Sequence, residues 1–95
     1  MDYFILPIFK KCSDDNFNEI IEKIINNDRD LISLECRWLN SDNFKLLFEA
    51  LKVNSSLTSL NLSFNKIKEE GVKALAEALT VNSTLTELNY LYINY

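Results

Sequence analysis

The stretch that decides the fold is residues 57–82, which read LTSLNLSFNKIKEEGVKALAEALTVN. Its first half has the spacing L-x-x-L-x-L-x-x-N-x-I, carried by Leu57, Leu60, Leu62, Asn65 and Ile67. Its second half has apolar residues at helical intervals, namely Val72, Leu75, Ala76 and Leu79. The stretch therefore predicts a strand, a tight turn and an amphipathic helix, a unit that cannot bury its apolar face alone.

This unit recurs along the chain with a period near 28 residues. A shift of that length lays the segment NSSL, which begins at Asn54, over NSTL, which begins at Asn82. The same shift superimposes the apolar positions of two helices, Phe44, Leu47 and Leu51 on Val72, Leu75 and Leu79. A repeat of this length predicts a solenoid, because neighbouring units must stack to bury a continuous core.

The quoted residues resemble the leucine-rich repeat family, specifically its long, helix-containing, ribonuclease-inhibitor-like subtype. The resemblance covers about residues 29–91, with a weaker helical echo from residue 14. It implies an α/β fold, a short leucine-rich repeat solenoid with parallel strands on the concave face and helices on the convex face. It also implies a non-catalytic protein–protein interaction module that binds a protein partner through the concave strand face.

We expect residues 1–95 to form a single leucine-rich repeat domain with four parts. These parts are an N-terminal cap with a diverged helical half-repeat (1–28), a degenerate repeat (29–56), a clean repeat (57–84) and a truncated repeat (85–95). The cap is the apolar run YFILPIF at residues 3–9. In the half-repeat, Ser13, Asp14 and Asp15 offer helix caps, and one helix face is formed by Phe17, Ile20, Ile21, Ile24 and Ile25. Its strand half is missing or diverged.

The degenerate repeat departs from the pattern at two positions. A shift of 28 residues places Ile32 and Leu34 at the inward strand positions. It also places Arg29 on a leucine, and Arg37 on the turn asparagine, of the clean repeat. A guanidinium has no hydrogen-bond acceptor, so it cannot replace an asparagine that both donates and accepts. Either Arg37 points outward, or the register slips locally and Asn40 becomes the turn residue.

Three further expectations concern the turns beside the two later helices. Trp38 should be at least partly buried beside the bend of the degenerate repeat. Ser41 or Asp42 should cap a helix over about residues 43–53, whose inward face is Phe44, Leu47, Phe48 and Leu51. Gly71 lies near the start of the clean repeat's helix, where a side chain would crowd the preceding strand or turn.

The candidate binding surface consists of the strand residues that alternate with the inward leucines. This set is small, polar and mildly acidic, and it comprises Ser33, Glu35, Ser59, Asn61, Ser63, Glu87, Asn89 and Leu91. The family resemblance implies that a protein partner docks there. The alternative interpretation is that these are ordinary solvent-facing strand residues.

Composition excludes several other classes of function. The net charge of −4 argues against a nucleic-acid surface, which requires clustered basic residues. The absence of histidine removes histidine-based catalysis and metal binding, and no cofactor is expected. Cys12 and Cys36 lack metal-ligand spacing; one disulfide is conceivable in a secreted chain, but we expect reduced thiols in the cytoplasm. The seven-residue apolar run at 3–9 is too short to span a membrane.

The C-terminal segment YLYINY, residues 90–95, supports an alternative function. It carries three tyrosines and departs from the repeat pattern where a leucine is expected. Three interpretations remain open: a strand that acts as its own cap, an edge for self-association, or a chain truncated from a longer array. In the last two cases the chain would be a structural or self-associating piece that pairs through this strand.

Overall fold

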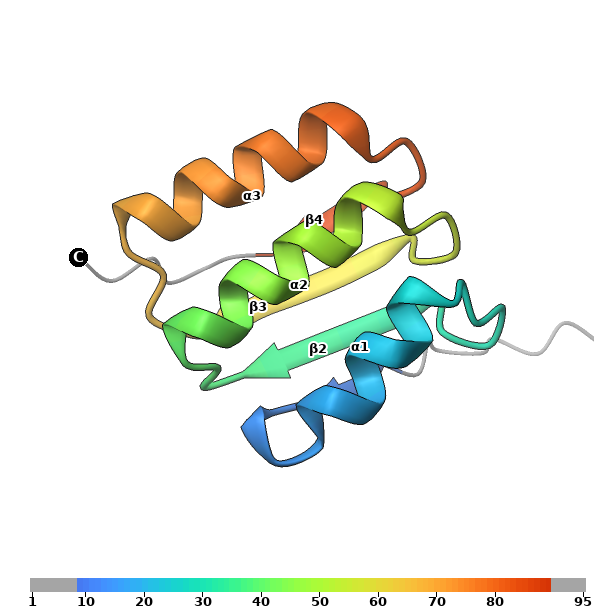
Figure 1. Ribbon diagram of the computed structural model, residues 1–95, viewed down its shortest axis with the longest axis horizontal. Helices are drawn as coiled ribbons and strands as arrows, with labels where there is room; N and C mark the ends of the chain where they lie inside the picture. The colour runs from blue at the N-terminus through green and yellow to red at the C-terminus, as the bar shows by residue number, and fades with distance from the viewer. Residues whose placement is uncertain (1–8, 90–95) are drawn as a thin grey trace, which may run out of the picture.

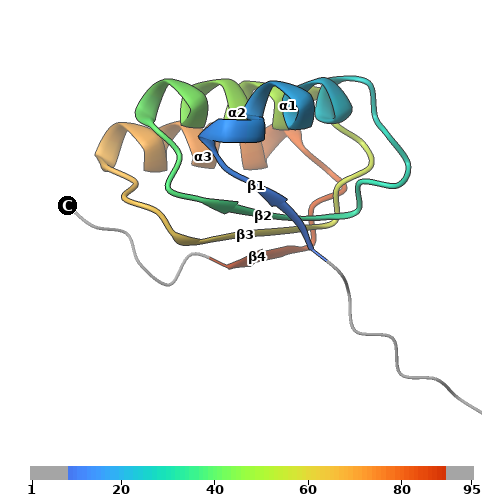
Figure 2. The same ribbon diagram turned by 90° about the horizontal axis from the view of Figure 1, so that it is seen from below.

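The computed structural model describes residues 9–89, which form two layers, one of helices and one of strands (Figures 1 and 2). The elements in chain order are β1 (Lys10–Cys12), the 3-10 helix η1 (Asp14–Asn16), α1 (Phe17–Ile25), β2 (Ser33–Arg37), α2 (Ser41–Val53), β3 (Ser59–Phe64), α3 (Glu69–Val81) and β4 (Glu87–Asn89). The four strands form one parallel sheet in the order β1-β2-β3-β4. The predicted α/β leucine-rich repeat architecture is therefore confirmed.

The core lies between the two layers. Leu34, Leu60 and Leu62 point from the strands toward the helices and are at most 1% exposed. They meet an apolar helix face made of Phe17, Ile20, Ile24, Phe44, Leu47, Phe48 and Leu51, all buried. Full burial of one such side chain contributes roughly 2 kcal/mol, so contact between the layers is the main stabilising term. The predicted inward face of α2 is confirmed.

Two expected helix faces need correction. Ile25, at the end of α1, is 53% exposed, because the buried Ile24 takes the inward position and the next residue lies a quarter turn away. On α3 the buried residues are Leu75 and Ala78, whereas Ala76 is exposed and Leu79 is 38% exposed. The equivalent of Leu79 on the preceding helix is fully buried, because α3 packs beside α2 (Figure 1).

The register of β2 differs from the 28-residue prediction. Ser33 is paired with Ser59, an offset of 26 residues, whereas α2 and α3 keep the offset of 28. Leu31, and not Arg29, therefore takes the first inward position, and it is 3% exposed. The predicted inward position of Ile32 is wrong, since its side chain is 52% exposed. The driving force is burial of a leucine in place of an arginine.

The local slip predicted for this repeat occurs, with a bulge between Glu35 and Arg37. Arg37 points outward and is exposed. Asn40 does not take over the turn asparagine's role. Its side chain instead accepts a 2.8 Å hydrogen bond from Asn43 N and caps α2, which begins one residue later. The expectation that Ser41 or Asp42 caps this helix is therefore wrong.

The first repeat has a strand half after all. β1 is three residues long and pairs in parallel with β2, with Cys12 opposite Cys36. Ser13 then caps η1: its hydroxyl accepts a bond from Asp15 N, and its own N–H donates to the side chain of Asn16. The strand is diverged rather than missing: Lys10 stands at the position where the other three strands carry a leucine.

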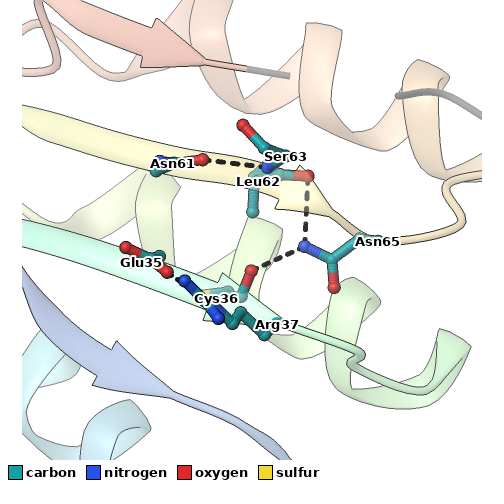
Figure 3. A network of polar contacts seen from close by, with 7 residues as sticks. All are labelled: Glu35, Cys36, Arg37, Asn61, Leu62, Ser63 and Asn65. Atoms are coloured by element: carbon teal, nitrogen blue, oxygen red, sulfur yellow. Dashed lines mark hydrogen bonds and ion pairs between the residues drawn. The ribbon is translucent and has the colours of Figure 1, made fainter. Parts of the chain in front are cut away.

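Asparagines tie each turn to the repeat before it. Asn65 donates to the carbonyls of Cys36 (2.7 Å) and Leu62 (3.1 Å), as Figure 3 shows, and it accepts from Leu39 N (3.0 Å). At the opposite ends of the strands, Asn54 donates to Ile24 O and accepts from two N–H groups of its own turn. Asn82 repeats this arrangement one unit later. The turn role expected for Asn65 is confirmed.

Candidate protein-binding surface

The outward face of the sheet, called here the strand face, carries the predicted binding residues in lateral rows. The register places Ser33, Ser59 and Glu87 side by side in one row. A second row runs across all four strands through Lys11, Glu35, Asn61 and Asn89. The two-residue slip of β2 leaves this face unchanged, because side chains alternate with a period of two. Leu91 lies outside the described residues.

The predicted binding residues differ in how far their side chains are exposed to a partner. Ser33, Ser59 and Ser63 are only 7–8% exposed. Within the described part of the chain, the buried Ser63 hydroxyl has no hydrogen-bond partner. Glu87 and Asn89 are exposed, and Asn61 is half-buried beside them. A partner on this face would therefore meet amides and a carboxylate rather than the serines.

A hollow in the strand face brings part of the N-terminal region to the same surface. It is lined by Phe9, Ser59, Leu60, Asn61, Glu87, Leu88 and Asn89. Ser59 Oγ donates to Glu87 Oε2 across 3.3 Å within it. Phe9, the last residue of the expected cap, is half-buried. Residues 3–8 of the cap lie outside the described part of the chain.

A second group of side chains extends the strand face at the carboxyl ends of β2 and β3. Arg37 forms an ion pair with Glu35, and its guanidinium lies 4.4 Å from the centre of the Phe64 ring (Figure 3 shows the ion pair). Phe64 is 45% exposed, and the Arg37 side chain is equally accessible. Stacking on an aromatic ring and pairing with a carboxylate hold the arginine in one orientation.

Trp38 completes this group, and its predicted burial is wrong. The indole is 65% exposed. The backbone at Trp38 has φ of 54°, in the left-handed region, and its N–H donates to Phe64 O at 2.9 Å. This conformation turns the next residue, Leu39, into the core and leaves Trp38 outside. A bulky residue held at positive φ is strained, and such strain is found at functional sites more often than elsewhere.

We call Arg37, Trp38 and Phe64 the aromatic–arginine cluster. The sequence led us to expect that Trp38 is at least partly buried, and none of the three was included in the predicted binding face. One feature of the sequence could have indicated this cluster: Arg37 stands where the clean repeat has its turn asparagine. A charged residue at that position indicates that side chains of this bend point outward.

Neither a group of metal ligands nor a membrane-spanning helix is found among residues 9–89. No group of three or more histidine, cysteine, aspartate or glutamate side chains is arranged there to hold a metal ion. In the same part of the chain, every helix is too short or too polar to cross a bilayer.

Comparison with known proteins finds a match that covers most of the clean repeat. Residues 53–76 match the family model described as Leucine Rich repeat. This segment is similar to a leucine-rich repeat. The match spans the last residue of α2, all of β3 and the first half of α3, which is the region that carries Asn65. No curated protein and no solved structure matches the chain.

The strand of the matched segment has neighbours on both sides. β3 pairs with β2 and β4, and the leucines at its inward positions are at most 1% exposed. Leucine-rich repeat domains generally mediate protein–protein interaction.

Proposed function

We propose that this chain is a non-catalytic protein-binding module of the ribonuclease-inhibitor-like subtype, acting as one domain over residues 1–95. Its partner is a protein that docks on the strand face. The observation that carries the proposal is the aromatic–arginine cluster, which is exposed beside the polar rows of that face. Tryptophan and arginine dominate the binding energy of protein interfaces, and serine contributes little.

The cluster is suited to docking because its residues are already restrained in the free chain, so binding costs less conformational entropy. Arg37 is already held by Glu35 and by the Phe64 ring. The backbone at Trp38 is held by its N–H bond to Phe64 O and by burial of the adjacent Leu39. Side chains fixed in this way lose less conformational freedom when a partner binds.

The polar rows define the rest of the interface. Glu87, Asn89 and Asn61 offer a carboxylate and two amides around the hollow, with Lys11 at the far end of the second row. The partner therefore presents an apolar or aromatic group to Trp38 and hydrogen-bonding groups to the rows. This arrangement matches the common anatomy of an interface, in which apolar anchors are bordered by a polar rim.

The test uses the full chain and three variants as baits for partners in a cell extract, followed by titration calorimetry with the purified partner. Trp38→Ala is expected to weaken binding about 30-fold, near 2 kcal/mol, because it removes the largest exposed anchor. Asn61→Lys places a charge in the hollow and is expected to weaken binding as well. Ala76→Lys on the exposed face of α3 is the matched control. Loss of binding in Ala76→Lys alone would move the interface to the helices.

A second candidate is self-association through the C-terminal edge. Within the described chain β4 pairs on one side only, and Leu79 and Val81 on α3 are 38% and 60% exposed. Sedimentation over a range of concentrations distinguishes the candidates. A monomer at all concentrations supports the binding module, whereas dimers that Tyr92→Lys dissociates support pairing through the C-terminal strand.

The proposed location is the cytoplasm. The two cysteines are free thiols buried in the core, the form that a reducing compartment maintains. Fractionation of cells that produce the tagged chain tests this, and recovery in the secreted fraction would contradict it.

A further inference from the structure

Cys12 and Cys36 lie opposite each other on neighbouring strands. β1 pairs with β2 so that the two cysteines are direct Cα partners. Both side chains point into the core, where they are 2% and 0% exposed, and both are free thiols. Neighbouring strands are about 4.8 Å apart, which falls within the Cα separations that a disulfide spans. The sheet therefore holds the two thiols side by side in the core, with a backbone separation that a disulfide can span.

We propose that this pair is an oxidation site: Cys12 and Cys36 form a reversible intramolecular disulfide with a low-molecular-weight disulfide such as oxidised glutathione as the oxidant. The bond ties β1, the strand of the diverged first repeat, to β2. Its formation closes a loop that contains η1 and α1, so the N-terminal half-repeat is fastened to the strand of the degenerate repeat.

The two thiols have different surroundings and so different roles. The Cys36 thiol donates a hydrogen bond to the Cys12 sulfur, which lowers the pKa of Cys12 against the opposing effects of burial and of the Asp14 carboxylate. The same hydrogen bond, together with burial, the charge of Cys12 and the Glu35 carboxylate, raises the pKa of Cys36. The thiolate is the reactive form, so Cys12 attacks first and Cys36 resolves.

The reaction is a two-step thiol–disulfide exchange. The Cys12 thiolate attacks one sulfur of oxidised glutathione, forms a mixed disulfide and releases one glutathione thiolate. Cys36 then loses its proton to that thiolate and attacks the Cys12 sulfur, which releases the second glutathione. Two protein thiols are oxidised and one glutathione disulfide is reduced to two thiols.

Access to the buried pair comes from β1 itself. It has only three residues, Cys12 is the last of them, and its partner in the described sheet is β2 alone. Short edge elements open locally at a much lower free energy than the whole domain. Opening β1 uncovers Cys12 while β2 remains paired with β3.

The test is mass spectrometry of the folded full chain after incubation with oxidised glutathione and alkylation of the remaining thiols. The expected product is a monomer that has lost two hydrogen atoms, retains no glutathione and yields a cross-linked pair of Cys12 and Cys36 peptides. Neither Cys12→Ala nor Cys36→Ala is expected to give this cross-linked product. A wild-type chain that keeps glutathione, joins to a second chain, or stays reduced would overturn the proposal.

A second measurement does not depend on the variants. The thermal midpoint of the oxidised wild-type chain is expected to rise by about 10 °C and to return on addition of dithiothreitol, because the bond restricts the unfolded chain. Amide hydrogen exchange at residues 10–12 should slow in parallel. An unchanged midpoint and unchanged exchange would show that the bond does not fasten β1.

Discussion

At the scale of single residues, the turn asparagines are the polar groups on which the fold depends. Asn65 is 2% exposed and satisfies a backbone N–H and two carbonyls that no water reaches. Arg37 could not take an equivalent place in the previous repeat, because a guanidinium cannot accept the bond. The structure resolves this conflict by turning Arg37 outward, which supplies part of the aromatic–arginine cluster.

Asn65→Ala is expected to lower the free energy of unfolding by about 3 kcal/mol, since it leaves Leu39 N and Cys36 O buried without partners. Urea denaturation followed by circular dichroism measures the change. Asn18→Ala, at an exposed position of α1, is the control and is expected to change stability by less than about 0.5 kcal/mol. Equal losses in the two variants would contradict the role given to Asn65.

Gly71 is the second residue with a defined steric role. A Cβ atom at this position would lie 2.6 Å from Cγ2 of the buried Ile67, so the predicted crowding at the start of α3 is confirmed. Gly71→Ala is expected to destabilise the chain by about 1 kcal/mol, since overpacking outweighs the gain in helix propensity. Ala76→Gly, on the exposed face of α3, is expected to lose a similar amount through propensity alone. A more stable Gly71→Ala variant would show that Ile67 yields easily.

At the scale of elements, burial depends on which helix packs beside which. Leu51 on α2 and Leu79 on α3 occupy equivalent repeat positions, yet they are 0% and 38% exposed. The difference arises because α3 covers α2, while no described helix covers the far side of α3 (Figure 1). A leucine at the same repeat position therefore contributes more to the free energy of unfolding on α2 than on α3.

Leu51→Ala is expected to cost about 3 kcal/mol and Leu79→Ala about 1 kcal/mol, because only the first leaves a cavity in the core. Thermal unfolding of both variants in one buffer provides the comparison. If the two losses were equal, Leu79 would be covered in solution, and the second candidate, self-association at this end, would gain support.

At the scale of the whole molecule, the chain is a row of units that contact only their neighbours. β2 and β3 have strands on both sides, whereas β1 and β4 lie at the two edges of the described sheet. Stability in such arrays is the sum of the units and their interfaces, so it falls toward the ends. The hydrophobic contacts also thin out there, since Leu85 and Leu88 are only partly buried.

Native-state hydrogen exchange is expected to reveal this gradient. The amides of Leu60 and Leu62 in β3 should exchange most slowly, and those of Lys11 and Leu88 at least tenfold faster, because edge strands open without global unfolding. Exchange read out by nuclear magnetic resonance measures the rates in the reduced chain. A common rate for all four strands would indicate a single cooperative unit and would also remove the route to Cys12.

The sequence by itself determined the type of each element after β1 and the alternation of side chains within β2 and β3, because these follow from local periodicity. It also determined the turn role of Asn65 and the need for glycine at position 71. A slip of two residues preserves the alternation, so the local pattern could not distinguish the offset of 26 from that of 28. Only the tertiary structure decided it, by burying Leu31 and leaving Arg29 in solvent. The tertiary structure also left Trp38 outside and, through the separate pairing of β1 with β2, brought Cys12 beside Cys36, since both depend on contacts between strands far apart in the chain.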